Sequence, residues 1–168
     1  MTRGDTGVPA RFVFSNPVHF LAFGFGSGLS PVAPGTAGTV VAIPFFLLMV
    51  SLNTGVYLLL TAAIFAVGIP ICGRTARDIG VHDHGGIVWD EIAGYLITMV
   101  AAPPGWLWVI AGFLAFRLFD VVKPWPIGWA DQRVSGGFGI MLDDAIAAIY
   151  AALLLWLLQV LSGSLASL

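Results

Sequence analysis

Five acidic residues stand where apolar stretches of the sequence begin or end, and their types and spacing suit metal chemistry. A single carboxylate at the start of a helix is commonly a cap, and capping is the alternative interpretation of each group. Adjacent carboxylates repel each other and one cap suffices, so the grouping favours a bound divalent cation. Oxygen ligands without a set of His or Cys favour Mg²⁺ over zinc. The five residues are Asp90 and Glu91, Asp143 and Asp144, and Asp120.

Two cations flank one of these carboxylates at equal spacing. Arg117 precedes Asp120 by three residues and Lys123 follows it by three, which on a helix places all three on one face. Arg offers a planar fork of donors and Lys a compact charge, and both bind phosphate. Snorkelling to the membrane surface, or pairing with Asp120, is the alternative for both cations. The arrangement suits a phosphate that is bridged by a metal ion.

Two glycine-rich stretches precede apolar runs. Residues 24–39 contain glycines and two prolines that exclude a regular helix over most of the stretch. Its backbone N–H groups could cradle a phosphate, with Gly35 and Thr36 as candidate contacts at the start of the next helix. It lacks the P-loop spacing of an NTPase, and a plain connecting loop is the alternative. A second glycine loop is expected at residues 136–139.

Histidine and cysteine contribute little to the predicted chemistry. His82 and His84 flank Asp83, but no further His or Cys completes a transition-metal site. We interpret them as polar surface residues, or at most as an aid to proton transfer. The one cysteine, Cys72, excludes an internal disulfide and is expected to be a packing residue.

The composition indicates that these residues are positioned by membrane helices. The chain of 168 residues is 58% hydrophobic and only 10% charged, with a mean hydropathy of +0.95. An ordinary soluble domain is about 25% charged. A very apolar soluble helical protein is the alternative, but an integral membrane protein is the preferred interpretation. The net charge of −2, with no polybasic segment, argues against nucleic acid as a partner.

The expected fold class is all-α, an integral membrane bundle of about four to five spanning helices with glycine-rich loops. Backbone groups in lipid must be satisfied internally, so the apolar runs should be helices. Residues 1–16 are expected to form a flexible cytoplasmic tail, and residues 17–168 a single membrane-embedded domain that opens with a short interfacial helix at 16–23. The five runs cover residues 36–51, 56–72, 88–102, 106–122 and 142–161.

The charges predict the orientation of this bundle. Threading the five runs up and down places every cation and every carboxylate on one side. The turns at 53–55 and 103–105 and the C-terminal residues 162–168 carry no charge. By the positive-inside rule the charged face is cytoplasmic. The sequence therefore predicts a multi-pass protein of the cytoplasmic membrane with its active site on the cytoplasmic side.

Four stretches of the sequence carry recognisable motifs: residues 26–39 (GSGLSPVAPGTAGT), 87–94 (IVWDEIAG), 116–127 (FRLFDVVKPWPI) and 136–144 (GGFGIMLDD). In this order they resemble the phosphatidylglycerophosphatase A family, and together they extend over most of the chain after residue 20. The resemblance implies a Mg²⁺-dependent lipid phosphatase of the bacterial inner membrane. Its substrate would be phosphatidylglycerophosphate, and its products phosphatidylglycerol and inorganic phosphate in glycerophospholipid synthesis.

By position in these motifs, the resemblance implies a set of site residues. Arg117 and Lys123 become candidate contacts of the substrate phosphate. The sequence leaves open one metal ion or two, attack by water or through an aspartyl-phosphate, and the oligomeric state. The candidate metal-binding and catalytic residues are Asp90, Glu91, Asp120, Asp143 and Asp144.

Two other functions stay open at this point. A membrane phosphotransferase that acts on lipid headgroups would use the same Mg²⁺ chemistry, but its Asp-rich signature on a single helix is absent. A small transporter without enzymatic activity would place ionisable residues at the bilayer midplane, whereas here they gather at one face.

Overall fold

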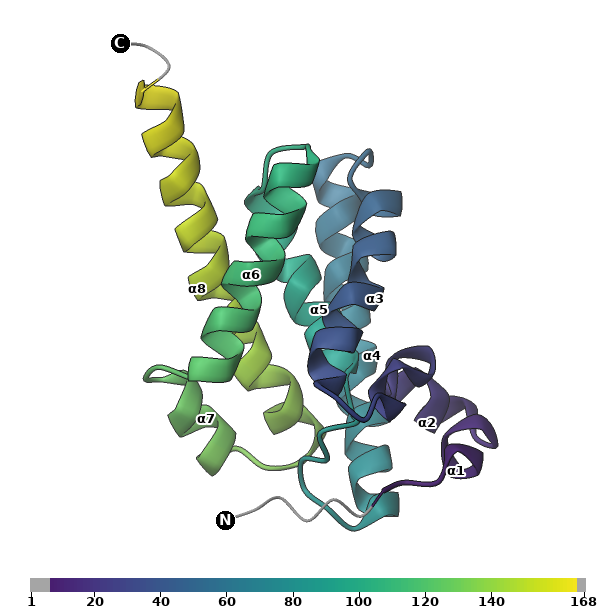
Figure 1. Ribbon diagram of the computed structural model, residues 1–168. Coiled ribbons are helices and arrows are strands. Elements are labelled where there is room, and N and C mark those ends of the chain that lie inside the picture. The colour runs from purple at the N-terminus through teal and green to yellow at the C-terminus, as the bar shows by residue number, and fades with distance from the viewer. Residues whose placement is uncertain (1–6, 166–168) are drawn as a thin grey trace.

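The structure is a computed structural model that describes residues 7–165 of the chain. Every regular element in that range is helical and no strand occurs there, which confirms the all-α prediction. Five longer helices run side by side, and three short helices lie around one end of them (Figure 1). The elements are α1 (Ala10–Phe14), α2 (Pro17–Ala22), the 3₁₀ helix η1 (Gly24–Leu29), α3 (Pro34–Met49), α4 (Thr54–Ile79), α5 (Trp89–Thr98), the 3₁₀ helix η2 (Met99–Ala101), α6 (Trp106–Val122), α7 (Ile127–Arg133) and α8 (Gly136–Leu165).

Helix α4 is longer than the sequence indicated. Asn53 caps its start, where the side-chain oxygen accepts a hydrogen bond from the Val56 N–H at 3.0 Å. The helix continues past the predicted end at residue 72 and stops only at Gly80, which has a left-handed φ of 80°. The prediction was wrong by about two turns, because Arg74 and Arg77 are good helix formers and mark no helix end.

Helix α8 begins within the second predicted glycine loop. Gly136–Gly139 forms its first turn, so the expected loop and the expected start at residue 142 were both wrong. The glycines serve close packing against α4. A β-carbon on Gly137 would lie 1.8 Å from the Ile69 carbonyl oxygen, and one on Gly73 would lie 3.0 Å from the Gly137 nitrogen. Any larger side chain at Gly137 would push α4 and α8 apart.

Helix α5 lies inside the bundle, packed against α3, α4 and α8. Ile92, Tyr95 and Leu96 are buried. The Tyr95 hydroxyl donates to the Val109 carbonyl at 3.1 Å, and the Tyr57 hydroxyl donates to the Leu96 carbonyl at 2.8 Å. Its 10 residues give a length of roughly 15 Å, about half of a hydrocarbon core. The run at 88–102 is therefore an internal half-length helix, and its N-terminus is held within the protein.

The N-terminal helices are docked on the end of α4. Residues 1–6 of the predicted tail lie outside the described residues, whereas Ala10–Phe14 within it forms α1. His19 of α2 is buried against α4, with its Nδ1 atom 3.0 Å from Thr75 Oγ1 and its Nε2 atom 3.4 Å from Asp78 Oδ2. Burial lowers the pKa of His19, although the nearby Asp78 opposes this. These contacts fix α2, the short helix that the sequence predicted at 16–23.

Two helices are long and apolar enough to cross a membrane. They are Thr54–Ile79, with 26 residues, and Gly136–Ser162, with 27 residues. Only 28% and 22% of their most apolar windows are buried, whereas the core helix of a soluble protein is mostly buried. Leu59 of α4 and Leu153 of α8 point outward and are more than half exposed. An apolar outer surface of this kind fits lipid better than water.

The charged side chains of the described residues gather at one end of the bundle. The turn between α3 and α4 and the turn between α5 and α6 lie at the opposite end, at the top of Figure 1. The starts of α3, α5 and α8 and the ends of α4 and α6 therefore meet at the charged end (Figure 1). This arrangement brings segments from along the whole chain to one place.

Candidate metal and phosphate site

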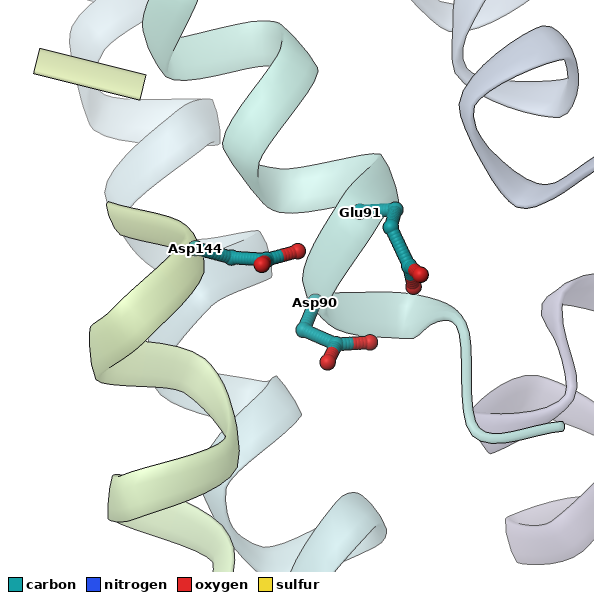
Figure 2. Close-up of side chains that lie close together, drawn as sticks. All are labelled: Asp90, Glu91 and Asp144. Carbon is teal, nitrogen blue, oxygen red and sulfur yellow. The ribbon is translucent and has the colours of Figure 1, made fainter. Parts of the chain in front are cut away.

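Three carboxylates from two helices meet at the charged end. Asp90 and Glu91 lie in the first turn of α5, and Asp144 lies near the start of α8, which packs against α5. Figure 2 shows the Asp144 side chain reaching across toward the start of α5, where the other two side chains lie. One oxygen atom from each carboxylate lies within 4.8 Å of the others. This spacing would let a single cation contact all three.

Helix capping does not account for these three carboxylates. Val88 occupies the N-cap position of α5, and no side chain caps it. Instead, each residue keeps a buried oxygen without a hydrogen-bond partner: Asp90 Oδ1, Glu91 Oε2 and Asp144 Oδ2. Unpaired anionic oxygens in a protein interior are costly, and a cation would satisfy them. The donor set is all oxygen, which fits Mg²⁺.

A cavity of about 300 Å³ opens beside the three carboxylates. A neighbouring cavity of about 640 Å³ has no Arg or Lys in its lining, so the smaller one is better suited to a phosphate. Of the nine site residues predicted from the sequence, eight line the smaller cavity and Thr36 does not. Those eight are Gly35, Asp90, Glu91, Arg117, Asp120, Lys123, Asp143 and Asp144.

Arg117 neutralises part of the carboxylate cluster. As the spacing predicted, it lies on the same face of α6 as Asp120 and donates a hydrogen bond to it. The same Nη1 atom lies 3.6 Å from Glu91 Oε1. The Arg117 Nε atom is buried and has no partner, so one donor of the guanidinium is unused. Arg117 therefore joins the α6 carboxylate to the α5 carboxylates.

Contrary to the prediction from the sequence, the Lys123 side chain does not share a helix face with Asp120. Helix α6 ends at Val122, and Lys123 follows it in a left-handed conformation with a φ of 46°. Its ammonium group donates to Asp143 at 2.6 Å and to Asp131 at 2.9 Å. Burial alone would lower the pKa of Lys123, but the two carboxylates outweigh it and raise that pKa. The expected helix face shared with Asp120 was wrong for Lys123, because the helix stops one residue too early.

The start of α3 also lines the cavity, close to Glu91 and Arg117. Ala33 adopts a left-handed φ of 47°, Pro34 opens the helix, and both line the cavity together with Gly35. The first N–H groups of a helix have no acceptor within it, so Gly35 offers a backbone donor. A β-carbon on Gly35 would lie 2.1 Å from Glu91 Oε1 and 3.0 Å from Arg117 Nη1. A larger residue at position 35 would therefore require the ends of these two side chains to shift.

We expect Gly35→Ala to lower the initial rate of phosphate release by about 10²-fold, because the added methyl group displaces Glu91 and Arg117. The matched control is Gly55→Ala in the exposed first turn of α4, where a β-carbon meets nothing closer than 3.4 Å. That variant should keep wild-type activity. Equal rates in both variants would contradict the close packing of Gly35 against the site.

Two acidic residues near the site were missed by sequence reasoning. Asp83 lines the cavity from the loop before α5, and Asp131 of α7 binds Lys123. The neighbouring histidines face the backbone, since His84 Nδ1 accepts from the Gly86 N–H and His82 Nε2 from the Gly136 N–H, both at 3.0 Å. The only signal for Asp83 was a carboxylate just ahead of the Asp-Glu pair. Nothing in the sequence singled out Asp131.

Comparisons with known proteins identify the family of the chain. The sequence profile of the family described as phosphatidylglycerophosphatase A matches residues 20–159. The chain is 51% identical over 148 residues to a phosphatidylglycerophosphatase A of Escherichia coli, covering 88% of this chain and 86% of that protein. It is 46% identical over 149 residues to a phosphatidylglycerophosphatase A of Haemophilus influenzae, covering 86% and 90%.

A more distant relative carries a different name. A protein of Bacteroides thetaiotaomicron, provisionally named a phosphatidylinositol-3-phosphatase, is 37% identical over 139 residues, covering 79% of this chain and 87% of that protein. Comparison with solved structures found no significant match.

Proposed function

Because the chain belongs to the phosphatidylglycerophosphatase A family, we propose that it hydrolyses phosphatidylglycerophosphate to phosphatidylglycerol and inorganic phosphate. The observation that carries the proposal is the cluster of Asp90, Glu91 and Asp144, with its unpartnered buried oxygens, in one cavity with Arg117 and Lys123. Carboxylates that can hold a cation, next to two phosphate-binding side chains, suit the cleavage of a phosphomonoester.

The metal ion that these residues fit best is Mg²⁺. Asp90, Glu91 and Asp144 would hold it, with Asp120 and Asp143 around the same cavity. When bound, Mg²⁺ neutralises charge on the phosphate and polarises phosphorus toward attack. A carboxylate left free of the metal can accept the proton of the attacking nucleophile.

The cations and the start of α3 would orient the phosphate. Arg117 has an unpaired Nε–H, and Lys123 has three donors, of which two are used by carboxylates. Gly35 adds a backbone N–H at a helix N-terminus, where the helix dipole favours an anion. These donors come from the start of α3, from α6 and from the residue that follows α6. They line the same cavity as the carboxylates of α5 and α8, so a phosphate bound there would meet both sets.

We place the protein in the bacterial inner membrane as a multi-pass bundle with its charged end on the cytoplasmic side. Helices α3, α4, α6 and α8 are the four spanning helices in this proposal, and α5 is the internal half-length helix. The exposed apolar side chains of α4 and α8 support contact with lipid. The acyl chains of the substrate then stay in the bilayer while its phosphate reaches the cavity.

Phosphate release from several phosphomonoesters tests the proposed substrate. Purified protein in mixed micelles would be given phosphatidylglycerophosphate, phosphatidic acid, phosphatidylinositol 3-phosphate and soluble glycerol 3-phosphate at equal phosphate concentration. We expect phosphatidylglycerophosphate to be hydrolysed fastest and the soluble ester least. Faster hydrolysis of phosphatidylinositol 3-phosphate would change the assigned substrate but not the type of reaction. Equal hydrolysis of the soluble ester would overturn the assignment of a lipid substrate.

Single cysteines test the proposed orientation. In a background in which buried Cys72 is replaced by Ala, Thr54→Cys and Pro104→Cys should react with a membrane-impermeant maleimide added to intact cells. Gln132→Cys, at an exposed position in α7, should react only after the membrane is opened. The reason is that the uncharged turns and the charged end lie on opposite faces. Labelling of Gln132→Cys in intact cells would show that the proposed orientation is wrong.

A further inference from the structure

The side chain of Lys123 is held between two carboxylates with different surroundings. Its ammonium group donates to Asp143 Oδ2 at 2.6 Å and to Asp131 Oδ1 at 2.9 Å. Asp143 lines the cavity with the other carboxylates, whereas Asp131 is not part of the cavity wall. Asp131 therefore binds Lys123, a proposed phosphate contact, but lies outside the group of carboxylates that line the cavity.

Helix α7 is built so that Asp131 reaches Lys123. Its residues Ile127 and Ala130 are fully buried, and α7 packs against α8. Gly128 lets the backbone come close, since a β-carbon there would lie 3.0 Å from the Lys123 carbonyl oxygen. The Ile127 N–H also donates to the Pro124 carbonyl at 2.8 Å, which fixes the turn between α6 and α7. Asp131 follows Ala130 directly, so these anchors determine its position.

The backbone of Lys123 supports the same interpretation. A non-glycine residue with a φ of 46° is uncommon, and such conformations persist where the surrounding structure holds them, often at functional sites. The left-handed residue ends α6 and turns the chain into α7, which brings residues 123 and 131 together. An ordinary surface ion pair would be mostly exposed, but the two side chains are only 23% and 27% exposed.

We infer that Asp131 is a positioning residue that holds the Lys123 ammonium at the cavity in the orientation that binds the phosphate of the substrate. Two of the three ammonium protons are directed to Asp131 and Asp143, which leaves the third for the phosphate. Without Asp131 the ammonium would be drawn to Asp143 alone and would lie over the carboxylates. The inference rests on the proposed function, because it takes Lys123 as a phosphate contact.

The first test compares steady-state kinetics of three variants. Asp131→Asn should raise KM for phosphatidylglycerophosphate about tenfold, because a neutral amide oxygen accepts the ammonium hydrogen bond more weakly than a carboxylate, and change kcat less than about twofold. Asp131→Glu should restore most of the affinity. Asp78→Asn is the matched control, because it removes an acidic residue at the same end of the bundle but outside the cavity, and should leave both constants unchanged.

The second test needs no turnover, because Lys123 is the only lysine in the chain. Amine acylation mapped by mass spectrometry distinguishes Lys123 from the N-terminal amine. Lys123 should be acylated several-fold faster in Asp131→Asn than in wild type, since a neutral amide holds the ammonium more weakly than one of the two carboxylates did. Inorganic phosphate should protect Lys123 in wild type and protect it less in the variant.

The outcomes separate the inference from the proposed function. An unchanged KM with unchanged acylation of Lys123 in Asp131→Asn overturns the inference. A fall in kcat and thermal stability without a change in KM also overturns it, because that pattern belongs to a purely structural residue. If the wild-type protein fails to hydrolyse any lipid phosphomonoester, the proposed function fails, whereas the acylation contrast still tests the link between Asp131 and Lys123.

Discussion

Asp144→Asn is expected to lower phosphate release at saturating lipid and Mg²⁺ by at least about a hundredfold while the protein stays as stable as wild type. The Asp144 side chain is buried close to Asp90 and Glu91, and its Oδ2 atom has no hydrogen-bond partner. An amide is a poor ligand for a hard cation, so metal binding and its electrostatic stabilisation of the transition state are lost. Removing one of three repelling carboxylates should leave the metal-free fold intact or stabilise it.

Initial rates and thermal unfolding in detergent, with and without Mg²⁺, measure both parts of this prediction. Asp90→Asn should behave like Asp144→Asn. Asp78→Asn serves as the control for the effect on activity of losing one negative charge at the same end of the bundle; it is not used for stability, because Asp78 also contacts His19. Near-normal turnover of Asp144→Asn would assign the cluster a structural role only, and a large loss of stability would mean that its carboxylates support the fold.

Arg117→Met is expected to lower both activity and stability. Its guanidinium donates to Asp120 and lies 3.6 Å from Glu91, and the Arg117 side chain is only 18% exposed. Removing one partner of a buried ion pair leaves uncompensated charge, which costs about 3 kcal/mol or more. The phosphate would also lose one of its two proposed cationic contacts, so KM should rise as stability falls.

A double variant distinguishes these effects. Adding Asp120→Asn to Arg117→Met removes one of the unpaired carboxylates, so it should recover part of the lost stability but none of the activity. Thermal unfolding of the two single variants and the double variant gives the coupling between Arg117 and Asp120. Strictly additive losses would contradict a direct pairing of these side chains.

The sequence predicted helices well where their ends carry strong breakers. The structure has α6 at Trp106–Val122, as expected, because Pro103, Pro104 and Gly105 precede it and Pro124 follows it. The start of α8 was misjudged because glycine indicates both loops and close helix packing, and Gly73, together with the two arginines after it, had the same effect on the predicted end of α4. Only the fold shows that Gly73 and Gly137 face each other. Helix α7 was missed because seven residues in a polar connection show no periodicity.

The candidate site was predictable where residue type alone carries the chemistry. Carboxylates at the starts of two helices and at the end of a third were expected to converge, and the structure brings them around one cavity. The partner of Lys123 was not predictable, because a left-handed residue after α6 redirects its side chain from Asp120 to Asp131 and Asp143. The catalytic and metal-binding roles of these residues stay predictions.

The central claim is that the carboxylates of α5 and α8 hold a Mg²⁺ ion that is required for cleavage of a lipid phosphomonoester. Its most direct test is phosphate release from phosphatidylglycerophosphate by wild-type protein and Asp144→Asn during a Mg²⁺ titration after treatment with EDTA. We predict no release from the metal-free wild type, full recovery as Mg²⁺ is added, and no recovery in Asp144→Asn. Full activity of the wild-type protein in metal-free buffer would contradict the claim.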